Sequence, residues 1–324
     1  MQAIVYHHYG PPDVLQLQEL QTPVPSADQV LLKVSAAAVN PYDWHFLRGA
    51  PAVLRIFLGL RKPKTTRLGA DVAGVVEAVG SNVTHLKPGD AVFGTATGAF
   101  AEYACAAADS LAFKPADITF AQAASLPIAG ITALQGLRDK GKLQSGQAVL
   151  INGAAGGVGT FAVQIAKSMG ARVTGVCSTR NIDLVRSIGA DRVLDYTREA
   201  FSHAAERYDL LFDFIGNHSL PDCLRVLQPT GTYVSCAGGG PEKKSMEFVG
   251  PALEHFIRAP FSRKKMPGLL AKINPADLEH LANLVATGKV TPVIERTYPL
   301  RETADAIRHI ETGHARGKVV ITIP

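Results

Sequence analysis

The sequence predicts an α/β protein with two domains, an antiparallel β-barrel and a doubly wound parallel sheet. Three observations lead to this prediction. A chain of 324 residues has room for about two domains. Residues 1–115 contain short strand patterns broken by Gly and Pro clusters, whereas from residue 118 onward strands alternate with helical patterns. A glycine-rich turn joins one of these later strands to the helix that follows it.

The first part of the chain has the period-two pattern of an antiparallel sheet. Strands are expected at Gln2–Tyr6, Gln29–Ala37, Val72–Val79 and Ala91–Phe93. Gly-Pro-Pro, Pro-Val-Pro and Lys-Pro-Gly-Asp segments separate them as turns. This part is therefore expected to form a barrel of short strands and turns.

The second part alternates strands and helices, as βαβ units do. Strands are expected at Ala148–Asn152, Arg172–Cys177, Val193–Asp195, Leu210–Phe214 and Gly231–Ser235, and helices at Gly159–Met169, Asn181–Ile188 and Leu220–Leu227. The tail returns to another pattern, with helices at Pro275–Ala286 and Thr303–Glu311 and strands at Ile294–Tyr298 and Lys318–Ile323. We expect this tail to pack on the first half.

Composition excludes several classes of protein. Hydrophobic residues make up 47% and charged residues 19%, which suits a large core and excludes a disordered chain. The net charge of +5 comes from interleaved Lys, Arg and 28 acids, so no nucleic acid is expected as a partner. The four cysteines form no CxxC pair, and the chain begins without a leader-like pattern, which favours a reducing, cytoplasmic location. Two uncharged stretches, 118–137 and 148–166, contain internal Gly, and no membrane span is expected.

The glycine-rich turn has the context of a dinucleotide-binding fingerprint. The apolar strand at 148–152 leads into Gly153-Ala154-Ala155-Gly156-Gly157-Val158-Gly159, and an apolar helix follows. Glycines let the backbone approach a pyrophosphate, and the N-terminus of the helix offers free N–H groups. We therefore expect cofactor contacts at Ala155, Gly156, Gly157 and Val158. Ala154 replaces the first glycine of the usual spacing, and the alternative is an ordinary βα turn.

The residues after the second strand indicate which dinucleotide binds. Enzymes that use NAD place Asp or Glu there to hold the ribose hydroxyls. This chain has Ser178, Arg180 and Asn181 and no acid. A hydroxyl and a guanidinium bind a 2′-phosphate well, so NADPH is favoured. The alternative for Arg180 is a solvated residue at the start of a helix.

Segments along the whole chain resemble the medium-chain dehydrogenase/reductase superfamily, in particular its zinc-independent quinone oxidoreductase branch (the zeta-crystallin and reticulon-4-interacting-protein-like group). They are Ala38–Asp43, Leu68–Val76, Pro88–Asp90, Gly98–Tyr103, Leu126-Pro127, Gly130–Ala133, Asn152–Gly159, Gly189–Asp191 and Gly317–Val320. The resemblance implies a GroES-like barrel domain at 1–118 and 275–324 and a Rossmann NADP-binding domain at 119–274. It also implies a homodimer.

The resemblance implies a reductase that works without metal. Zinc alcohol dehydrogenases of the superfamily have a Cys ligand where this chain has Asn40, and a His-Glu pair where it has Ala70-Asp71. Without zinc to stabilise an alkoxide, alcohol oxidation is disfavoured. The expected activity is hydride delivery from NADPH to a small lipophilic electrophile, a quinone or an α,β-unsaturated carbonyl (enone). The alternative is an NADPH-binding redox sensor or regulatory partner with little turnover.

Three residues are candidates for catalysis. The resemblance makes Asn40 a donor to the substrate oxygen, with Asn-Pro turn chemistry as the alternative. His45 lies where relatives often carry a Tyr and could donate a proton, although a lone His is more often structural. Tyr42 is a further candidate donor or ring platform.

Other cofactor contacts are carried over from the resemblance. Thr132 is expected beside the nicotinamide or its ribose, and Tyr196 near the adenosine phosphate. The loops with Ile215-Gly216 and Gly238-Gly239 are expected at the carboxyl edge of the parallel sheet. Lys318 could also reach the cofactor, or it could be a solvated terminal lysine.

Two segments, 52–64 and 253–270, combine apolar and basic residues. They could form an apolar lid over a lipophilic acceptor, contact an anionic membrane surface, or pack between domains or subunits with solvated cations. The sequence leaves these three open. It also does not identify the acceptor or decide between one-electron and two-electron transfer.

Overall fold

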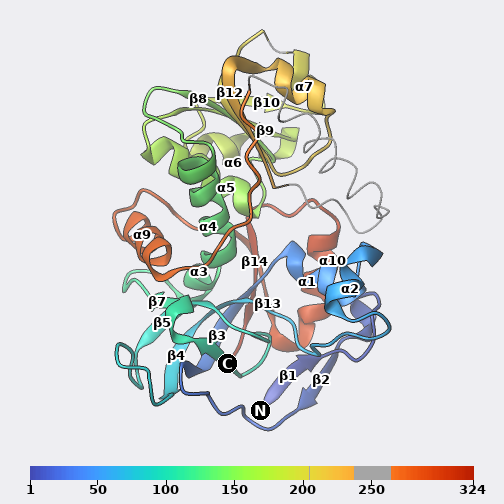
Figure 1. Ribbon diagram of the computed structural model, residues 1–324, viewed down its shortest axis with the longest axis vertical. Coiled ribbons are helices and arrows are strands. Elements are labelled where there is room, and N and C mark those ends of the chain that lie inside the picture. The colour runs from blue at the N-terminus through green and yellow to red at the C-terminus, as the bar shows by residue number, and fades with distance from the viewer. Residues whose placement is uncertain (204, 237–263) are drawn as a thin grey trace. The chain divides into compact units, whose positions relative to one another are not determined.

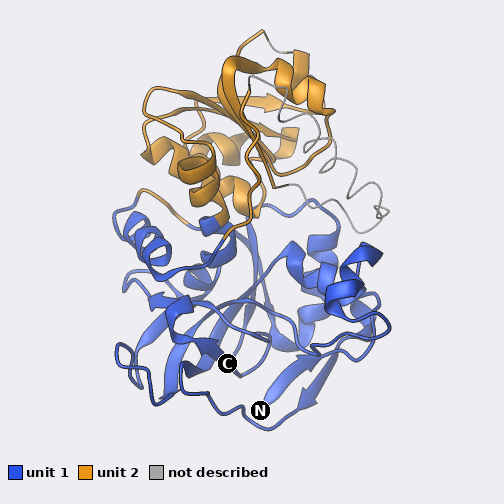
Figure 2. Cartoon of the chain, viewed as in Figure 1, with its two compact units in different colours: residues 1–131, 272–288, 292–324 blue, residues 132–271, 289–291 orange. Residues whose placement is uncertain are grey.

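The computed structural model of the chain describes residues 1–203, 205–236 and 264–324 and divides into two compact units (Figure 2). Unit 1 contains residues 1–131, 272–288 and 292–324, and unit 2 contains the described part of 132–271 with 289–291. The predicted combination of a barrel-like antiparallel unit and a parallel-sheet unit is confirmed. The expected boundary at residue 118 precedes α3 (Phe120–Ala124), which packs on four strands of unit 1 and belongs with them.

Unit 1 is built mainly from antiparallel strands, with short helices between them (Figure 1). Its strands are β1 (Gln2–Val5), β2 (Gln16–Glu19), β3 (Gln29–Val39), β4 (Asp71–Val79), β5 (Ala91–Thr95), β6 (Tyr103–Ala107), β7 (Leu111–Phe113), β13 (Ile294–Pro299) and β14 (Lys318–Thr322). Its helices are η1 (Pro12–Val14), α1 (Pro41–Arg48), η2 (Ala52–Leu54), α2 (Arg55–Leu58), η3 (Ala108–Ser110), α3, α9 (Pro275–Ala286), η8 (Leu300–Glu302) and α10 (Thr303–Glu311). The seven-stranded sheet has the order β13-β14-β3-β4-β5-β7, with β6 also paired to β3.

Strand β3 is the centre of this sheet, because it pairs with β4, β6 and β14. Its alternating pattern predicted one buried face, but most of its residues are buried. Its second face includes the buried residues Leu31, Ala37 and Val39, while Lys33 on that face stays exposed. The pairing with β14 makes the C-terminal segment part of the barrel sheet.

Helix α1 is an element that the sequence did not indicate. Asn40 is its N-cap residue, Pro41 occupies the first helical turn, and Asp43 completes a capping box by accepting the Asn40 backbone N–H at 2.8 Å. Gly49 ends the helix in the left-handed conformation, with φ of +53°. The expected Asn-Pro turn is therefore the start of a helix that carries Tyr42 and His45.

The described part of unit 2 contains a five-stranded, entirely parallel sheet and its crossover helices. The strands are β8 (Ala148–Asn152), β9 (Arg172–Cys177), β10 (Arg192–Asp195), β11 (Tyr208–Asp213) and β12 (Leu227–Ser235). The helices are α5 (Gly157–Ser168), η5 (Thr179–Asn181), α6 (Ile182–Ser187), η6 (Phe201–His203) and α7 (Leu220–Arg225). Helix α4 (Pro127–Gln135) spans the boundary between the units and continues as a π-helix, η4 (Gly136–Lys140).

The strand order is β10-β9-β8-β11-β12, so the direction of winding reverses between β8 and β11. In doubly wound folds, ligands bind outside the carboxyl ends of the strands at this reversal. The glycine turn follows β8, and the loop with Ile215 follows β11, so both lie at that position. Helix α7 ends earlier than expected and β12 begins earlier, because Leu227 already pairs with Tyr208 of β11.

The described residues contain no helix that is both long enough and apolar enough to cross a bilayer. The uncharged stretch 118–137 is divided between α3, α4 and the start of η4, and the stretch 148–166 between β8 and α5. All four cysteines are free thiols.

Candidate functional site

The glycine turn after β8 is shaped so that α5 begins with open backbone donors. Gly153 has φ of +90°, and Gly156 is the N-cap residue of α5 with no side chain to cap the helix. A Cβ on Gly159 would lie 2.0 Å from the Gly153 carbonyl oxygen, so this position needs glycine. The N–H groups of the first helical turn have no partner within the helix and suit an anion such as a pyrophosphate.

A buried carboxylate fixes the loop beside this turn. Asp213 accepts hydrogen bonds from the Asn152 side-chain amide at 2.9 Å and from the backbone N–H groups of Ile215 and Gly216, both at 3.0 Å. The backbone donors of this predicted loop therefore point inward, toward Asp213. The Ile215 side chain remains 45% exposed and lies 2.9 Å from the position a Cβ would take on Gly153. The structure thus brings two predicted contact regions together.

The segment after β9 carries an unsatisfied buried acceptor. Asn181 is 7% exposed, and its amide nitrogen donates to Ser178 Oγ at 3.3 Å. Its carboxamide oxygen finds no donor within the described ranges of the chain. Buried polar atoms in native proteins almost always have a partner, so this oxygen fits a ligand hydroxyl or amine. Ser178 is half-buried and Arg180 is exposed in the same segment.

Sequence reasoning missed one acid near this segment. Asp195, at the end of β10, accepts a 2.5 Å hydrogen bond from the Thr179 hydroxyl and further bonds from the Thr197 backbone and hydroxyl. These bonds, with the Thr179 hydroxyl first, lower the pKa of Asp195. The Asp195 carboxylate therefore orders the segment after β9 through Thr179. It does not take the place of the Asp or Glu that NAD enzymes carry at the end of the second strand. Tyr196, the next residue, is 49% exposed.

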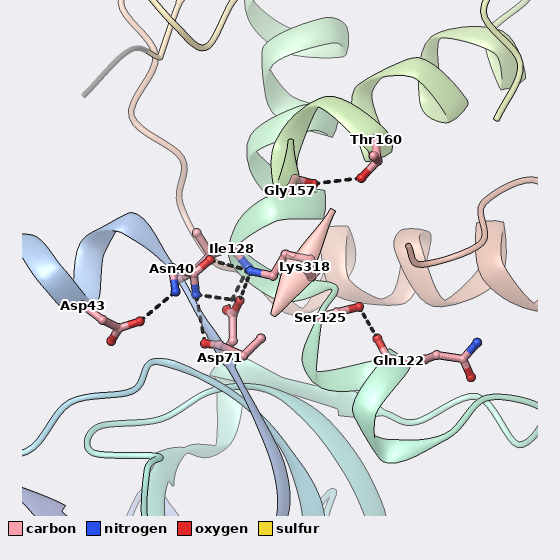
Figure 3. A network of polar contacts seen from close by, with 10 residues as sticks. Asn40, Asp43, Asp71, Gln122, Ser125, Ile128, Gly157, Thr160 and Lys318 are labelled. Atoms are coloured by element: carbon pink, nitrogen blue, oxygen red, sulfur yellow. Dashed lines mark hydrogen bonds and ion pairs between the residues drawn. The ribbon is translucent and has the colours of Figure 1, made fainter. Parts of the chain in front are cut away.

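Unit 1 contains a buried polar cluster, formed by Asn40, Asp71 and Lys318 (Figure 3). The Lys318 ammonium donates to Asn40 Oδ1 at 2.6 Å and lies 3.4 Å from Asp71 Oδ2. Asn40 Nδ2 donates to Asp71 Oδ2 at 2.9 Å and to the Ala38 carbonyl at 3.3 Å. Lys318 is 3% exposed, so it is not a solvated terminal lysine.

Two carboxyl groups lie in or beside this cluster. Asp71 Oδ1 accepts the Ile128 N–H at 2.9 Å, and burial raises the pKa of Asp71 against the opposing effect of the Lys318 ammonium. Asp43 accepts backbone N–H groups from Asn40 and Gly69, yet its complete burial raises its pKa to about 7. A sequence signal existed for Asp43, since Asn followed three residues later by Asp fits a capping box.

The cluster is satisfied from within. Both hydrogens of the Asn40 amide and its oxygen are engaged by protein atoms, so the amide has no donor left for a substrate oxygen in this arrangement. The structure brings the predicted residues Asn40 and Lys318 together, but it does so through Asp71. Their visible role is to hold the carboxyl end of β3 against the start of β14.

Tyr42 and His45 lie on α1, next to this cluster in sequence. The Tyr42 ring contacts the Phe46 ring in a tilted arrangement, with centroids 3.9 Å apart. Tyr42 is 43% exposed, and burial of its remaining surface raises its pKa to about 12. His45 Nδ1 lies 2.7 Å from the Ala50 carbonyl, and burial lowers the His45 pKa. Because a carbonyl only accepts, Nδ1 carries the proton, and neutral His45 has no proton on Nε2.

The other predicted residues are placed as follows. Thr132 is buried on α4, while Gly238 and Gly239 lie outside the described residues. No group of three or more His, Cys, Asp or Glu that could hold a metal ion occurs among the residues described here. The positions expected from zinc enzymes hold Asn40, Ala70 and Asp71, of which two belong to the buried cluster.

Known proteins match the chain along its whole length. Residues 26–116 match the family model described as alcohol dehydrogenase GroES-like domain, and residues 188–321 match the one described as zinc-binding dehydrogenase. The chloroplastic NADPH-dependent alkenal/one oxidoreductase of Arabidopsis thaliana is 36% identical over 99% of this chain and 79% of its own. The human mitochondrial NAD(P)H oxidoreductase RTN4IP1 is 34% identical, covering 100% of this chain and 89% of its own.

The fold of a solved relative agrees with these matches. The structure of the quinone oxidoreductase from Coxiella burnetii has a TM-score of 0.86 and 33% identity, and covers 100% of this chain and 99% of that one. The barrel unit, the parallel-sheet unit and the glycine turn together define an oxidoreductase of the medium-chain dehydrogenase/reductase class. The chain belongs to this superfamily and, within it, to the quinone oxidoreductase branch.

Proposed function

We propose that this chain is a zinc-independent, NADPH-dependent reductase that delivers hydride to a quinone or an α,β-unsaturated carbonyl compound. The observation that carries the proposal is the segment after β9. It has no carboxylate at the ribose position, and it carries Ser178, Arg180 and the Asn181 oxygen, for which the described residues offer no donor. The names of the relatives, an alkenal/one oxidoreductase and quinone oxidoreductases, support this acceptor class.

The cofactor fits the residues that unit 2 presents. The N–H groups at Gly157, Val158 and Gly159 would face the pyrophosphate, and Ser178 with Arg180 would face the 2′-phosphate. A bound nicotinamide supplies the hydride, and the protein supplies orientation and charge stabilisation. Asn181 Oδ1 would accept a hydrogen bond from a cofactor hydroxyl and so gain a partner that the described part of the chain does not supply.

Unit 1 contributes a proton donor and a rigid frame. Tyr42 carries its phenolic proton at neutral pH, burial raising its pKa still further above 7, and this half-exposed side chain can donate to an oxygen that becomes negative. Asn40 is a positioning residue, since Lys318 and Asp71 hold it at the N-cap of α1 and thereby fix the helix that carries Tyr42. His45 contributes to this frame through the hydrogen bond from its Nδ1 to the Ala50 carbonyl oxygen.

Zinc independence is proposed from the chemistry of the side chains. An amide and a methyl group stand where zinc enzymes have thiolate and imidazole ligands, and Asp71 is committed to Lys318 and the Ile128 N–H. Metal analysis of the purified chain is expected to show zinc well below one atom per chain. Stoichiometric zinc would overturn this part of the proposal.

The main test measures NADPH and NADH affinity together with turnover on a panel of quinones and enones. We expect a clear preference for NADPH and oxidation of NADPH by at least one class of acceptor. Arg180→Ala is expected to weaken NADPH binding about tenfold and to leave NADH binding unchanged, because only NADPH carries the 2′-phosphate. Arg172→Ala, at the opposite end of β9, is the matched control and should change neither.

Two outcomes would contradict the proposal. A preference for NADH would show that Arg180 does not select the 2′-phosphate of NADPH, which is the basis of the proposed cofactor. Tight NADPH binding without turnover on any acceptor would favour the redox sensor instead. Tyr42→Phe separates chemistry from binding, because the loss of the hydroxyl should lower kcat about tenfold or more while the Kd for NADPH stays the same.

We also propose a homodimer in a reducing, cytoplasmic setting. The free cysteines support the reducing setting, and the superfamily resemblance supports the dimer. Because the names of two relatives place them in the chloroplast and the mitochondrion, the localisation experiment must be able to detect those compartments too. Light scattering after size exclusion tests the dimer, and fractionation of the source cells tests the compartment.

A further inference from the structure

Exposed apolar side chains are concentrated in one short part of unit 1. Ile56 is 61%, Phe57 73% and Leu60 72% exposed, and these are three of the ten large hydrophobic residues that are exposed among the described positions. Single exposed hydrophobics are common on protein surfaces, but three within five residues form a patch. We define the basic apolar turn as residues 55–64, which contain all three.

The basic apolar turn is anchored at its base. The Tyr9 hydroxyl donates to the Gly59 carbonyl at 2.7 Å, and the Arg55 guanidinium lies 4.6 Å from the centre of the Tyr9 ring. Arg55 also donates to two backbone carbonyls at the end of α1. The Lys64 N–H closes the turn on the Leu58 carbonyl at 2.8 Å. The exposed side chains therefore project from an ordered platform.

Gly59 gives this turn its shape. Its φ of +120° lies in a region that favours glycine, and a Cβ there would lie 2.2 Å from the Lys62 carbonyl oxygen. The chain reverses tightly at this point, which places Leu60, Arg61 and Lys62 at the tip. Hydrophobic and basic side chains are thus presented side by side from one compact turn.

The charge of this region has a single sign. Residues 44–70 contain six Lys and Arg and no Asp or Glu. Arg61, Lys62 and Lys64 are exposed, and none of them is paired with a carboxylate in the described part of the chain. Unpaired cations around an apolar tip are complementary to a surface that is anionic outside and apolar beneath.

The size of the patch favours a lipid surface over a protein partner. A standard protein interface takes about 800 Å² from each partner, which is more than three side chains supply. A bilayer interface needs no matching shape and accepts a few apolar side chains together with Lys and Arg, whose stems reach toward the headgroups. A projecting tip also suits insertion.

We propose that the basic apolar turn docks this protein on an anionic lipid surface, with Ile56, Phe57 and Leu60 inserted among the headgroups and Arg61, Lys62 and Lys64 held by lipid phosphates. The docking would hold the chain at the phase in which lipophilic compounds dissolve. It does not rest on the proposed function, because binding to vesicles needs neither cofactor nor acceptor.

The test is sedimentation of the full chain with vesicles of phosphatidylcholine alone or of phosphatidylcholine with phosphatidylglycerol. The wild-type chain should bind the anionic vesicles and be released by salt. The triple variant Arg61→Glu, Lys62→Glu, Lys64→Glu should bind about a hundredfold more weakly, since each cation near an anionic surface contributes about fivefold. The triple variant Ile56→Ser, Phe57→Ser, Leu60→Ser should lose about tenfold or more.

Matched controls remove the same chemistry elsewhere. Lys87→Glu, Lys142→Glu, Lys289→Glu makes the same change in net charge, and Leu17→Ser, Val24→Ser, Leu270→Ser removes three other exposed hydrophobics. Both controls should bind as the wild type does within about threefold. Thermal melting of every variant checks that it is folded.

Three outcomes would overturn the proposal. One is failure of the wild-type chain to sediment with anionic vesicles. Another is equal loss of binding in the turn variants and their controls, which would indicate non-specific charge. The third is a fall in self-association in the apolar triple variant with unchanged vesicle binding, because a second copy of the chain would then be the occupant.

Discussion

The two polar sites of this protein, one in each unit, differ in how completely their groups are paired. The buried cluster of unit 1 is closed, since Asn40, Asp71 and Lys318 satisfy one another. The glycine turn of unit 2 and the segment after β9 are open, with an uncapped start of α5 and an Asn181 oxygen that has no donor in the described ranges. Closure is typical of a group that holds a shape, and openness is typical of a group that awaits a ligand.

The strongest way to break the closed site is to remove its cation. Lys318→Met would leave Asp71 buried without its ammonium partner, and we expect the free energy of unfolding to fall by about 3–5 kcal/mol. Urea unfolding at pH 7.5, followed by the fluorescence of Trp44, the single tryptophan and a residue of unit 1, measures this.

The exposed Lys289→Met is the control and should change stability by less than about 0.5 kcal/mol. Adding Asp71→Asn to Lys318→Met should recover part of the loss, because the unpaired charge is then gone. A loss below about 1 kcal/mol in the single variant would mean that the cluster is not a stabilising frame.

A second test of the closed site varies pH and follows the contribution of Asp43 to stability. Burial raises the pKa of Asp43 in the folded chain from its ordinary value of 3.8 to about 7, so the folded state retains a proton that the unfolded state has released. The stabilisation from Asp43 is therefore largest at low pH and is lost as pH rises through 7. Between pH 5 and 7 it should decline by about 2 kcal/mol, since one pKa unit corresponds to about 1.4 kcal/mol.

Asp43→Asn removes this titration, so the unfolding free energy of the variant should depend less on pH between 5 and 7 than that of the wild type. The measurement is the difference in unfolding free energy between wild type and variant across this pH range. A difference that stays constant with pH would show that Asp43 titrates at its ordinary pKa in the folded chain.

The open site is tested by two glycines of the same turn. A Cβ on Gly156 would meet nothing closer than the Gly153 oxygen at 3.4 Å, so Gly156→Ala should fold normally. It should still weaken NADPH binding about tenfold, because the methyl group occupies the side on which a pyrophosphate approaches. Isothermal titration gives the Kd.

Gly159→Ala is the contrasting variant, with its Cβ 2.0 Å from the Gly153 oxygen. It should lose stability and affinity together, because the turn itself must move. If Gly156→Ala bound NADPH as tightly as wild type, the pyrophosphate would not lie on this turn.

The smallest effect is expected at His45, and it tests whether Tyr42 or His45 of α1 is the proton donor. His45 is neutral near pH 7, since burial lowers its pKa, and its Nδ1 proton is directed to the Ala50 carbonyl. His45→Gln should therefore change kcat less than about threefold and leave the pH profile between about pH 6 and 8 unchanged. Loss of a pH limb in the variant would make His45 the proton donor.

The sequence predicted the parallel sheet well, because apolar strands, the glycine turn and the following helix are local patterns. It also placed the glycine turn after one strand and Ser178 and Asn181 after the next, and the parallel pairing of β8 with β9 puts both strand ends at the same edge of the sheet. Helix α1 was missed, since its capping signals involve Asn40 and Asp43 in a region read as turns.

The buried cluster could not be predicted. Asn40, Asp71 and Lys318 are far apart in sequence, and they meet only because β3 pairs with both β4 and β14. Asp71 also stands at the start of an apolar strand, where a carboxylate has no local reason to be buried. Contacts of this range carry no periodic signal, so three-dimensional structure was needed to find them.

The position of β14 has a consequence for the order in which the protein matures. Ala36 of β3 pairs with Thr322 of β14, so all of unit 2 leaves the ribosome before this pair can form. Until then, the edge of β3 that pairs with β14 is exposed, and Asn40 and Asp71 lack the ammonium group of Lys318. The parallel-sheet unit can fold during synthesis, whereas the barrel must be completed after it, and in that interval the nascent chain is exposed to chaperones and to aggregation.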